Sequence, residues 1–327
     1  MRNDLVQQGV RFLQHSNVQD TPLSERLLFL EKKGLTPSEI AAALKLSEDK
    51  NVSRAAQAVA SVTSSKSGER LQDRIGVIVG GNIGLGLFIA IKLAKEGARL
   101  AIVGDKTANV SVADSVEAQF KAAEGMNPVK IYEGELHRSI FIDETYTAIS
   151  QEFGRIDFVV NCIPSPKDSG IKNASLVDVD AAAWDESMGV SAKAVFLSCK
   201  RAVQQMLTQD NGAVRGRIVN ISSMYGMVAR KGHFTFGVSK AAIVQLTRQI
   251  AVEYAASGIV CNAVAPGFID DSINRDDCLP PASRNIIPAG EPGKSMDVAN
   301  AVTFLVSDDA RYIHGINLLV DGGYMAC

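Results

Sequence analysis

The chain has 327 residues, which at roughly 150 residues per domain indicates about two domains. Its 34 Lys and Arg residues against 36 Asp and Glu give a net charge of −2, and this balance argues against nucleic-acid binding and against a polybasic membrane contact. No long apolar run and no apolar leader are present, so we expect neither a membrane-spanning nor a secreted protein. Five scattered cysteines and four distant histidines predict a reducing compartment and no metal site.

The first 46 residues predict a small three-helix all-α domain. Apolar residues recur at helical spacing in its first part: Leu5, Val6, Gly9, Val10 and Leu13. Thr21-Pro22 supplies an N-cap and a first-turn proline for a second helix that ends near Gly34. Thr36-Pro37-Ser38-Glu39 combines a capping box with Pro at N1, which predicts a third helix through Leu46. Such a short unit buries little apolar area, so we expect it to be marginally stable alone.

The segments VRFLQHSNV and TPLSERLLFLEKKGLTPSEIAAAL resemble the N-terminal domain of the peroxisomal docking protein Pex14 over about residues 2–46. The resemblance implies a groove for helical peptides of the W-x-x-x-F/Y type from the peroxisomal import machinery. Phe12 and Phe29 would be its pocket aromatics, with Lys32 and Lys33 at a basic rim. By spacing alone the two phenylalanines would simply fill a small core. Pex14 proper continues into a hydrophobic segment and a coiled coil, whereas this chain continues differently.

Residues 47–72 predict a flexible linker, because Ser, Ala, Lys and Asn dominate and apolar periodicity is weak. A short helix around Arg54–Val62 is the one element expected within it. Residues 73–327 then form the large domain, in which apolar strands alternate with amphipathic helices. We therefore predict three parts: a docking domain at 1–46, a linker at 47–72 and a nucleotide-binding domain at 73–327.

The large domain opens with the pattern of a phosphate cradle. The apolar strand Ile75–Val79 is followed by a glycine-rich turn, a helix through Glu96 and a second strand at Arg99–Val103. Glycines permit a tight turn and close backbone approach, and the helix N-terminus supplies N–H groups and partial positive charge. The turn residues expected to contact a dinucleotide are Gly80, Asn82, Gly84, Leu85 and Gly86.

Several later motifs resemble the short-chain dehydrogenase/reductase family over about residues 73–326, and they occur in that family's order: RIDFVVN, GRIVNISS, SKAA, NAVAPG and VDGG. The resemblance implies a doubly wound, Rossmann-type α/β fold with a seven-stranded parallel sheet. It also implies a bound NAD or NADP and a homotetramer or dimer. The further cofactor contacts that it implies are Gly104, Asp105, Lys106, Glu135, Asn161, Lys240, Pro266, Gly267 and Ile269.

The end of the second strand decides between the two dinucleotides. An acidic residue there hydrogen-bonds the ribose 2′-OH of NAD, whereas Arg or Lys pairs with the 2′-phosphate of NADP. The sequence offers Gly104, Asp105 and Lys106, which is a mixed signal. Gly104 takes the usual acidic position and leaves room for a phosphate, so we favour NADP slightly; a solvated turn with no role in selection is the alternative.

The catalytic positions are only partly filled. A typical family member uses Asn, Ser, Tyr and Lys, with the Tyr phenol exchanging the proton. Ser223 and Lys240 stand in their places, Ser191 replaces the Asn, and Phe236 replaces the Tyr. Phe cannot transfer a proton, which predicts a loss of about 10²–10⁴ in rate for ordinary carbonyl reduction. Three explanations stay open: an introduced substitution, a domain that binds cofactor without turnover, or a proton donor elsewhere.

Tyr225 is the candidate for that other donor. It follows Ser223 by two residues, and its offset from Lys240 resembles 2,4-dienoyl-CoA reductases of the mitochondrial type, where a displaced Tyr protonates the substrate. The alternative is that Tyr225 forms part of the substrate pocket wall, as in ordinary family members.

Two functions from different classes follow. The first is an NAD(P)(H)-dependent oxidoreductase acting on a carbonyl or conjugated enoyl substrate, including an acyl-CoA. The second is a catalytically impaired scaffold whose oligomer multiplies weak peptide-docking contacts. Both predict association with peroxisomes, and a cytoplasmic protein otherwise. The terminal Tyr324–Cys327 segment lacks an S-K-L address, so we expect recruitment through a partner.

Overall fold

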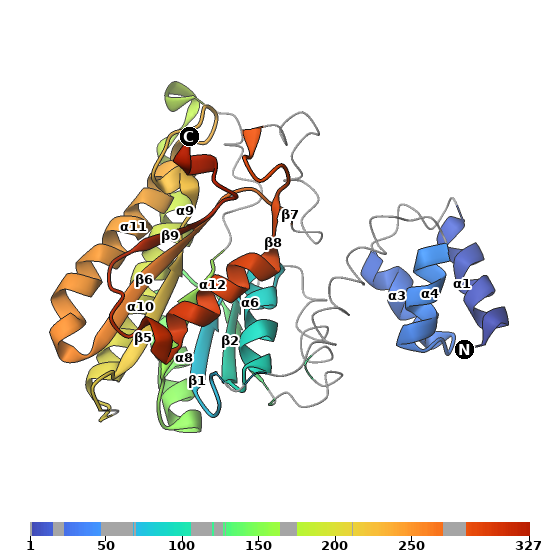
Figure 1. The fold of residues 1–327 in the computed structure, drawn as a ribbon, viewed down its shortest axis with the longest axis horizontal. Coiled ribbons are helices and arrows are strands. Elements are labelled where there is room, and N and C mark those ends of the chain that lie inside the picture. Colours follow the sequence, from blue (N-terminus) through green and yellow to red (C-terminus); the bar gives the residue numbers. More distant parts are fainter. Residues whose placement is uncertain are drawn as a thin grey trace. The chain divides into compact units, whose positions relative to one another are not determined.

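The computed structural model divides the chain into two compact units, a small one that holds the N-terminal helices and a large one that holds the sheet (Figure 1). The structure describes residues 2–15, 23–46, 68, 70–105, 120, 127, 129–163, 175–210, 212–270 and 286–327. The predicted helix at Arg54–Val62 and one predicted cofactor contact, Lys106, lie outside the described residues.

The small unit is the predicted three-helix domain. Its helices are α1 (Asn3–Gln14), α3 (Leu23–Lys32) and α4 (Pro37–Leu46). One apolar cluster joins them: Val6, Val10, Leu13, Leu30, Leu35, Ile40 and Ala43. Gly9 lies in this core because a Cβ there would meet the Ala43 Cβ at 3.0 Å. The helical spacing read from the sequence is therefore confirmed.

The capping box at the start of α4 is also confirmed, and it has an additional partner. The Thr36 N–H and hydroxyl both donate to Glu39 Oε2, at 3.0 and 2.9 Å. Arg2 donates to the same carboxylate from Nη2 at 2.7 Å and from its backbone N–H at 2.8 Å. The Arg2 guanidinium holds the pKa of Glu39 well below its usual range. One buried carboxylate thus joins the residue before α1 to the first turn of α4.

The large unit contains a seven-stranded parallel sheet in the order β3-β2-β1-β4-β5-β6-β9. Its strands are β1 (Ile75–Val79), β2 (Arg99–Asp105), β3 (Lys130–Gly134), β4 (Phe158–Asn161), β5 (Gly216–Ile221), β6 (Ile259–Pro266) and β9 (Asn317–Val320). The order reverses between β1 and β4, which is the switch point where doubly wound folds bind ligands. A separate two-stranded sheet pairs β7 (Ile269–Asp270) with β8 (Gly293–Lys294).

Helices cover both faces of this sheet, as Figure 1 shows. They are α6 (Gly84–Lys95), α8 (Ser139–Phe153), α9 (Ala181–Met188), α10 (Ala194–Leu207), α11 (Phe234–Tyr254) and α12 (Ser295–Val306). Val77 and Val79 of β1 pack into the layer formed by α8, α10 and α11. Ile78 lies between them and points to the other layer, where α6 packs on α12. The doubly wound fold is confirmed; none of the helices in the described part of the chain has the length and apolarity to cross a membrane.

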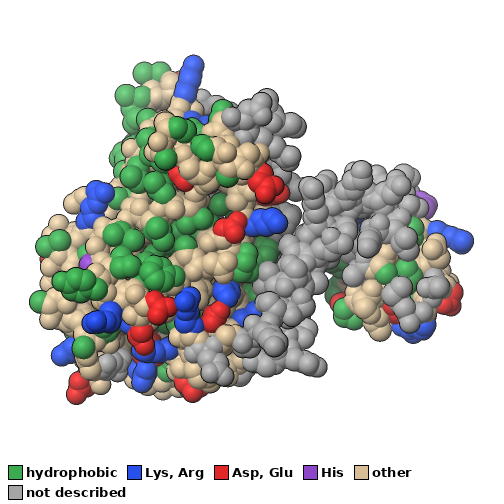
Figure 2. All heavy atoms as spheres, in the orientation of Figure 1, with side chains coloured by type: hydrophobic (Ala, Val, Ile, Leu, Met, Phe, Trp, Pro, Cys, Tyr) green, Lys and Arg blue, Asp and Glu red, His purple; other side chains and the backbone are tan. Residues whose placement is uncertain are grey.

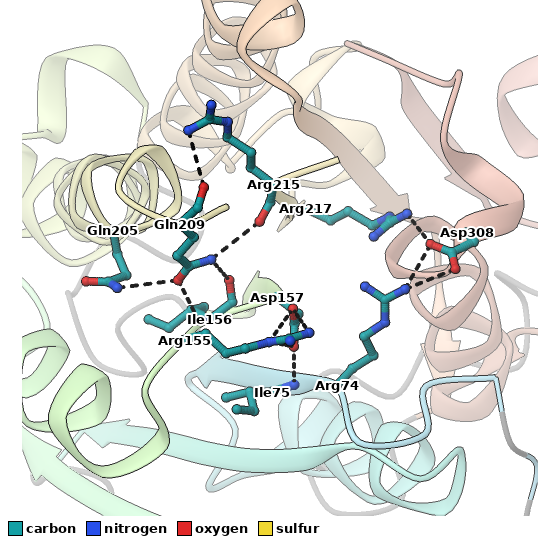
Figure 3. A network of polar contacts seen from close by, with 10 residues as sticks. All are labelled: Arg74, Ile75, Arg155, Ile156, Asp157, Gln205, Gln209, Arg215, Arg217 and Asp308. Carbon is teal, nitrogen blue, oxygen red and sulfur yellow. Dashed lines mark hydrogen bonds and ion pairs between the residues drawn. The ribbon is translucent and has the colours of Figure 1, made fainter. Parts of the chain in front are cut away.

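A polar network joins the amino ends of β1, β4 and β5 (Figure 3). Asp157 accepts the Ile75 N–H at 2.7 Å and pairs with Arg155 Nη2 at 2.6 Å. Asp308, which follows α12, accepts from Arg217 of β5 at 2.5 Å and from Arg74 at 3.0 Å. These bonds fix the strand ends opposite to the carboxyl edge, so the carboxyl edge is left for a site.

The large unit begins earlier than the predicted linker boundary. Leu71 is 1% exposed, and its N–H donates to the Glu96 carbonyl at the end of α6. The Asp73 N–H donates to the carbonyl of Gly97. Residues 70–72, placed in the linker by their polar neighbours, therefore pack as part of the sheet unit.

Candidate functional site

The glycine-rich turn joins β1 to α6 and holds backbone close to backbone. Gly80 has a φ of +79°, and a Cβ there would overlap the carbonyl of Cys162 at the end of β4. A Cβ on Gly86 would overlap the carbonyl of Gly80, so α6 can approach β1 only with glycine at 86. Gly84 begins α6 with a φ of +49°, and Leu85 follows it in the first turn. The turn therefore opens the N-terminus of α6 toward the carboxyl edge of the sheet.

Asn82 lies inside this turn with an unpaired acceptor. Its side chain is 1% exposed, and its Oδ1 is buried without a hydrogen-bond partner. A Cβ on Gly104 would meet the Asn82 Nδ2 at 2.5 Å and Cγ at 2.6 Å. The amide of Asn82 thus occupies the space where an acidic side chain at position 104 would begin. Asp105, the last residue of β2, is half-buried.

The residues at this edge fit a dinucleotide. A buried amide oxygen without a partner costs about 1–3 kcal/mol, which a ligand hydroxyl donor would recover. The turn glycines leave room for a diphosphate at the N-terminus of α6. On the other side of the switch point, β6 ends at Pro266, and the Gly267 N–H donates to the Val320 carbonyl at 2.9 Å. A Cβ on Gly267 would lie 2.7 Å from Asp321, and Ile269 begins β7 just beyond.

Lys240 and Ser223 lie at the carboxyl end of β5. Lys240 of α11 is buried, and its Nζ donates to the carbonyl of Ile221 at 3.3 Å. Ile221 is the last residue of β5, and Ser223 follows it by two residues. Burial lowers the pKa of Lys240 to about 8. The ammonium is therefore held beside the strand end that carries Ser223.

The side chain of Phe236 fills the position expected of a proton donor with an apolar ring. Phe236 lies on the first turns of α11, and the Lys240 Nζ is 5.7 Å from its ring centroid. The Tyr225 ring packs edge-on against Phe236, with centroids 6.4 Å apart. Ser223, Tyr225, Phe236 and Lys240 are thus brought to one place, but Phe236 offers no exchangeable proton there.

The hydroxyl of Tyr225 is engaged by an arginine that the sequence reading did not single out. Arg230 Nη1 donates to it at 2.6 Å, and the Tyr225 backbone N–H donates to Ser223 Oγ at 3.2 Å. His233 stacks on the Tyr225 ring at 5.3 Å. Burial raises the pKa of Tyr225, and Arg230 opposes this rise. The basic run Arg230-Lys231, five residues past Tyr225, is the signal that could have pointed to this contact.

Ser191 lies in a π-helical turn, Gly189–Lys193, between α9 and α10. Its Oγ is buried without a hydrogen-bond partner, and the residue is 1% exposed. π-Turns within helices often mark functional sites. Its contact with substrate or water stays a prediction.

Two other predicted cofactor residues have protein partners. Asn161 is fully buried at the end of β4: its Nδ2 donates to Asn220 Oδ1 at 2.8 Å, and its Oδ1 accepts from Ser198 at 2.5 Å. Its side chain thereby ties β4 to β5 and α10, which leaves only its backbone for a ligand. Glu135 follows β3 and pairs with Arg138. Among the described residues no cluster of His, Cys, Asp or Glu has the makings of a metal site.

The predicted docking residues of the small unit lie together. The Phe12 and Phe29 rings stack with centroids 4.4 Å apart, and the Lys33 Nζ lies 5.4 Å from the Phe29 ring. Phe29 is 40% exposed and Leu28 is 52% exposed, so part of this aromatic pair faces solvent. Lys32 ends α3 and is exposed. Phe12 packs on the core. The structure is therefore consistent with both predictions for the pair, a peptide-docking surface and a core contact.

Comparison with known proteins accounts for both units. Residues 79–325 match the family described as Enoyl-(Acyl carrier protein) reductase, and residues 1–46 match the Pex14 N-terminal domain. The 2-(R)-hydroxypropyl-CoM dehydrogenase of Xanthobacter autotrophicus is 33% identical over 77% of this chain and 99% of its own length. The 3-oxoacyl-(acyl-carrier-protein) reductase FabG of Thermotoga maritima is 33% identical over 78% of this chain and 98% of its own.

The fold of the large unit also matches a solved structure. The crystal structure of gox2181 superposes with a TM-score of 0.69 at 26% identity, covering 79% of this chain and 98% of that one. The chain therefore belongs to the short-chain dehydrogenase/reductase family, and its first 46 residues match the Pex14 N-terminal domain.

Proposed function

We propose that the large unit is an NAD(P)(H)-dependent oxidoreductase that acts on a carbonyl or conjugated enoyl compound, including an acyl thioester. The observation that carries the proposal is the convergence of the glycine cradle, Ser223 and the buried Lys240 at one edge of the sheet. A bound dinucleotide would supply or accept the hydride. Lys240 would hold its ribose by the ammonium, and Ser223 would donate a hydrogen bond to the substrate oxygen.

The proton has to come from a group other than Phe236. Tyr225 is the candidate, because its phenol adjoins Phe236 and its backbone contacts Ser223. Arg230 holds the Tyr225 hydroxyl as an acceptor, and this favours the phenolate that forms when the proton leaves. This arrangement supports a displaced donor of the dienoyl-CoA reductase type. Comparing NADPH oxidation by Tyr225→Phe and the parent with a short dienoyl-CoA tests it, and an unchanged rate rules Tyr225 out as donor.

We favour NADP over NAD as the cofactor. The position that selects NAD by a carboxylate is Gly104, and the Asn82 amide leaves no room for an acid there. Because position 104 carries no carboxylate, it does not repel a 2′-phosphate. Binding of NADPH at lower concentration than NADH supports the choice, and the reverse order overturns it.

Restoring the phenol tests the catalytic proposal most sharply. Phe236→Tyr is expected to give carbonyl reduction at least about 10²-fold faster than the parent, because it supplies a positioned acid beside Lys240. The combined variant Phe236→Tyr with Lys240→Met is the matched control and is expected to lose the gain. If Phe236→Tyr binds dinucleotide and reduces no carbonyl compound, Ser223 and Lys240 are not working catalytic parts.

The second candidate function is a scaffold that binds dinucleotide without turnover, and Phe236 is the observation that favours it. In this account the oligomer presents several small units at once, so weak contacts with W-x-x-x-F/Y-type helices add up by avidity. Activity that appears only in Phe236→Tyr, with none in the parent, supports the scaffold. Turnover by the parent with any enoyl or carbonyl substrate removes it.

The small unit is proposed to dock helical peptides of the peroxisomal import machinery and so to bring the protein to peroxisomes. Support comes from the match to the Pex14 N-terminal domain and from the partly exposed Phe12–Phe29 pair beside Lys33. Helix-in-groove recognition relies on such aromatic anchors. Loss of peroxisomal co-localisation on deleting residues 1–46 supports the proposal, and unchanged localisation overturns it.

We propose that the protein assembles as a homotetramer or dimer. The edge strand β9 is half-exposed along its whole length, and apolar side chains gather on the face that carries β9 and α12 (Figure 2). On α10 and α11, Phe196 is 48% and Val252 is 82% exposed. Apolar surfaces of this kind mark interfaces. Sedimentation at micromolar concentration should show a dimer or tetramer, and a monomer contradicts the assembly.

A further inference from the structure

Arg230 is held at the rim of the site by two aromatic rings. Its Cζ lies 5.5 Å from the Tyr225 ring centroid and 5.8 Å from that of Phe268. Those rings meet edge to face at 6.4 Å, and Tyr324 packs edge-on against Phe268 at 5.3 Å. The guanidinium is therefore positioned by the Tyr225 hydroxyl and by two nearby aromatic rings, although the residue as a whole is exposed.

This guanidinium is linked to Ser223 through Tyr225. Tyr225 joins the two, because its hydroxyl accepts from Arg230 Nη1 at 2.6 Å and its backbone N–H donates to Ser223 Oγ at 3.2 Å. Phe268 directly follows Gly267, one of the predicted cofactor contacts. Arg230 thus lies one tyrosine side chain away from the hydroxyl proposed to hold the substrate oxygen.

The charge of Arg230 is not neutralised by any carboxylate in the part of the chain that the structure describes. Its polar contact there is the Tyr225 hydroxyl, which uses one of five guanidinium N–H donors. Lys231 follows it and is exposed, and His233 stacks on the same Tyr225 ring. Among the described residues, Arg230 therefore keeps its positive charge and has N–H donors to spare.

We propose that Arg230 binds a carboxylate of the substrate, so that the substrate is a short oxo acid or enoic acid with its reacting carbon near Ser223. The proposal rests on the oxidoreductase function given above and names its substrate class. A planar guanidinium fork with unused N–H donors suits a carboxylate, which accepts two parallel N–H bonds. The separation of Arg230 from Ser223 by one tyrosine side chain suits a carboxylate only a few bonds from the carbonyl.

The alternative is that Arg230 only fixes the position of the Tyr225 ring. Two substitutions separate the roles. Arg230→Gln still offers an N–H to the Tyr225 hydroxyl but has no charge. Arg230→Lys keeps a charge and a donor but loses the two-pronged geometry. Lys231→Gln is the matched control, because it removes the neighbouring exposed charge and leaves Arg230 in place.

The test is calorimetric titration of acetoacetate and of its neutral methyl ester into the full chain. Each titration is run twice, once with the chain saturated with NADP⁺ and once with the chain free of dinucleotide. We expect acetoacetate to bind at least about tenfold more tightly than the ester in the parent and in Lys231→Gln, since a charge-assisted hydrogen bond is roughly twice as strong as a neutral one. Arg230→Gln should abolish this difference, Arg230→Lys should keep part of it, and the ester should bind all variants equally.

Equal binding of acid and ester by the parent overturns the proposal, and so does an unchanged preference in Arg230→Gln. The titration without dinucleotide keeps the two claims apart. If neither NADPH nor NADH binds, the oxidoreductase function fails, while the preference for acetoacetate still decides whether Arg230 is a carboxylate site.

Discussion

Asn82 and Gly104 compete for one space at the carboxyl edge of the sheet. A Cβ at position 104 would lie 2.5 Å from the Asn82 Nδ2 and 2.6 Å from its Cγ. Asn82 is 1% exposed, so its amide has little freedom to move aside. The absence of an acidic residue at position 104 of β2 is thus linked to the Asn82 amide, which comes from the glycine-rich turn.

Gly104→Ala should therefore destabilise the large unit by about 1–3 kcal/mol, the usual cost of overpacking. Adding Asn82→Ala to Gly104→Ala should recover most of this loss, because the two amide atoms nearest the added Cβ are then absent. Urea unfolding of the single and double variants measures the coupling. Gly189→Ala is the control, since a Cβ there has nothing within 4 Å. Strictly additive effects of the two substitutions would show that the residues do not compete.

Lys240 gives a pH-dependent prediction. Its pKa is about 8 in the folded chain against 10.5 for a free side chain, so between those values the unfolded chain binds the proton that the folded chain has released. Stability of the dinucleotide-free parent should rise across this window. Lys240→Met lacks this rise. The free energy of unfolding of Lys240→Met minus that of the parent should therefore be about 3 kcal/mol larger at pH 7 than at pH 10.5.

Urea unfolding at both pH values measures this gain, with the exposed Lys193→Met as control. The lost bond to Ile221 shifts both measurements equally, so only the pH dependence is diagnostic. If the parent and Lys240→Met differ by the same free energy of unfolding at pH 7 and at pH 10.5, burial does not lower the pKa of Lys240.

The pair formed by Arg217 and Asp308 predicts a non-additive effect. The Arg217 side chain is 3% exposed, so Asp308→Ala leaves a buried cation without its carboxylate (Figure 3). We expect a loss of about 1–3 kcal/mol in the free energy of unfolding. Adding Arg217→Met should restore part of it, because the buried charge is then absent.

The neighbouring residue provides the control for this pair. Asp309 pairs with Arg70, and both side chains are about half-exposed. Asp309→Ala should cost less than about 1 kcal/mol. Equal losses for Asp308→Ala and Asp309→Ala would contradict the burial argument.

The small unit yields a binding prediction. Phe29→Ala should weaken the binding of a W-x-x-x-F/Y helical peptide by at least about tenfold, the loss typical of an aromatic anchor. Gln7→Ala, an exposed change on α1, should leave the affinity unchanged. Fluorescence anisotropy of a labelled peptide measures both, and circular dichroism checks that Phe29→Ala stays folded. A folded Phe29→Ala with parental affinity would assign the aromatic pair to the core alone.

The sequence predicted the backbone architecture better than the side-chain geometry. The apolar run of β1, the glycine turn and α6 form where expected, because strand, turn and helix preferences agree locally. The capping box at Thr36 and Glu39 formed for the same reason. Local patterns of this kind depend on neighbours in the chain.

The contacts that sequence reading missed join distant positions. Arg230 reaches Tyr225 and Phe268 because a turn and the end of β6 meet at one sheet edge. Asn161 matches a cofactor motif, yet its amide bonds Asn220 and Ser198. Leu71 stands among polar residues and packs beneath the end of α6. Such partners follow from sheet order and burial, which residue spacing does not contain.

The most direct measurement is titration of the dinucleotide-free full chain with NADPH and NADH, followed by the enhancement of nicotinamide fluorescence. A cofactor site at the carboxyl edge of the sheet predicts saturable binding of at least one of them. It also predicts clear weakening in Gly86→Ala, whose added Cβ would press α6 away from Gly80, and in Lys240→Met. No binding of either dinucleotide, or equal binding by the parent and both variants, would contradict a cofactor site at the carboxyl edge of the sheet.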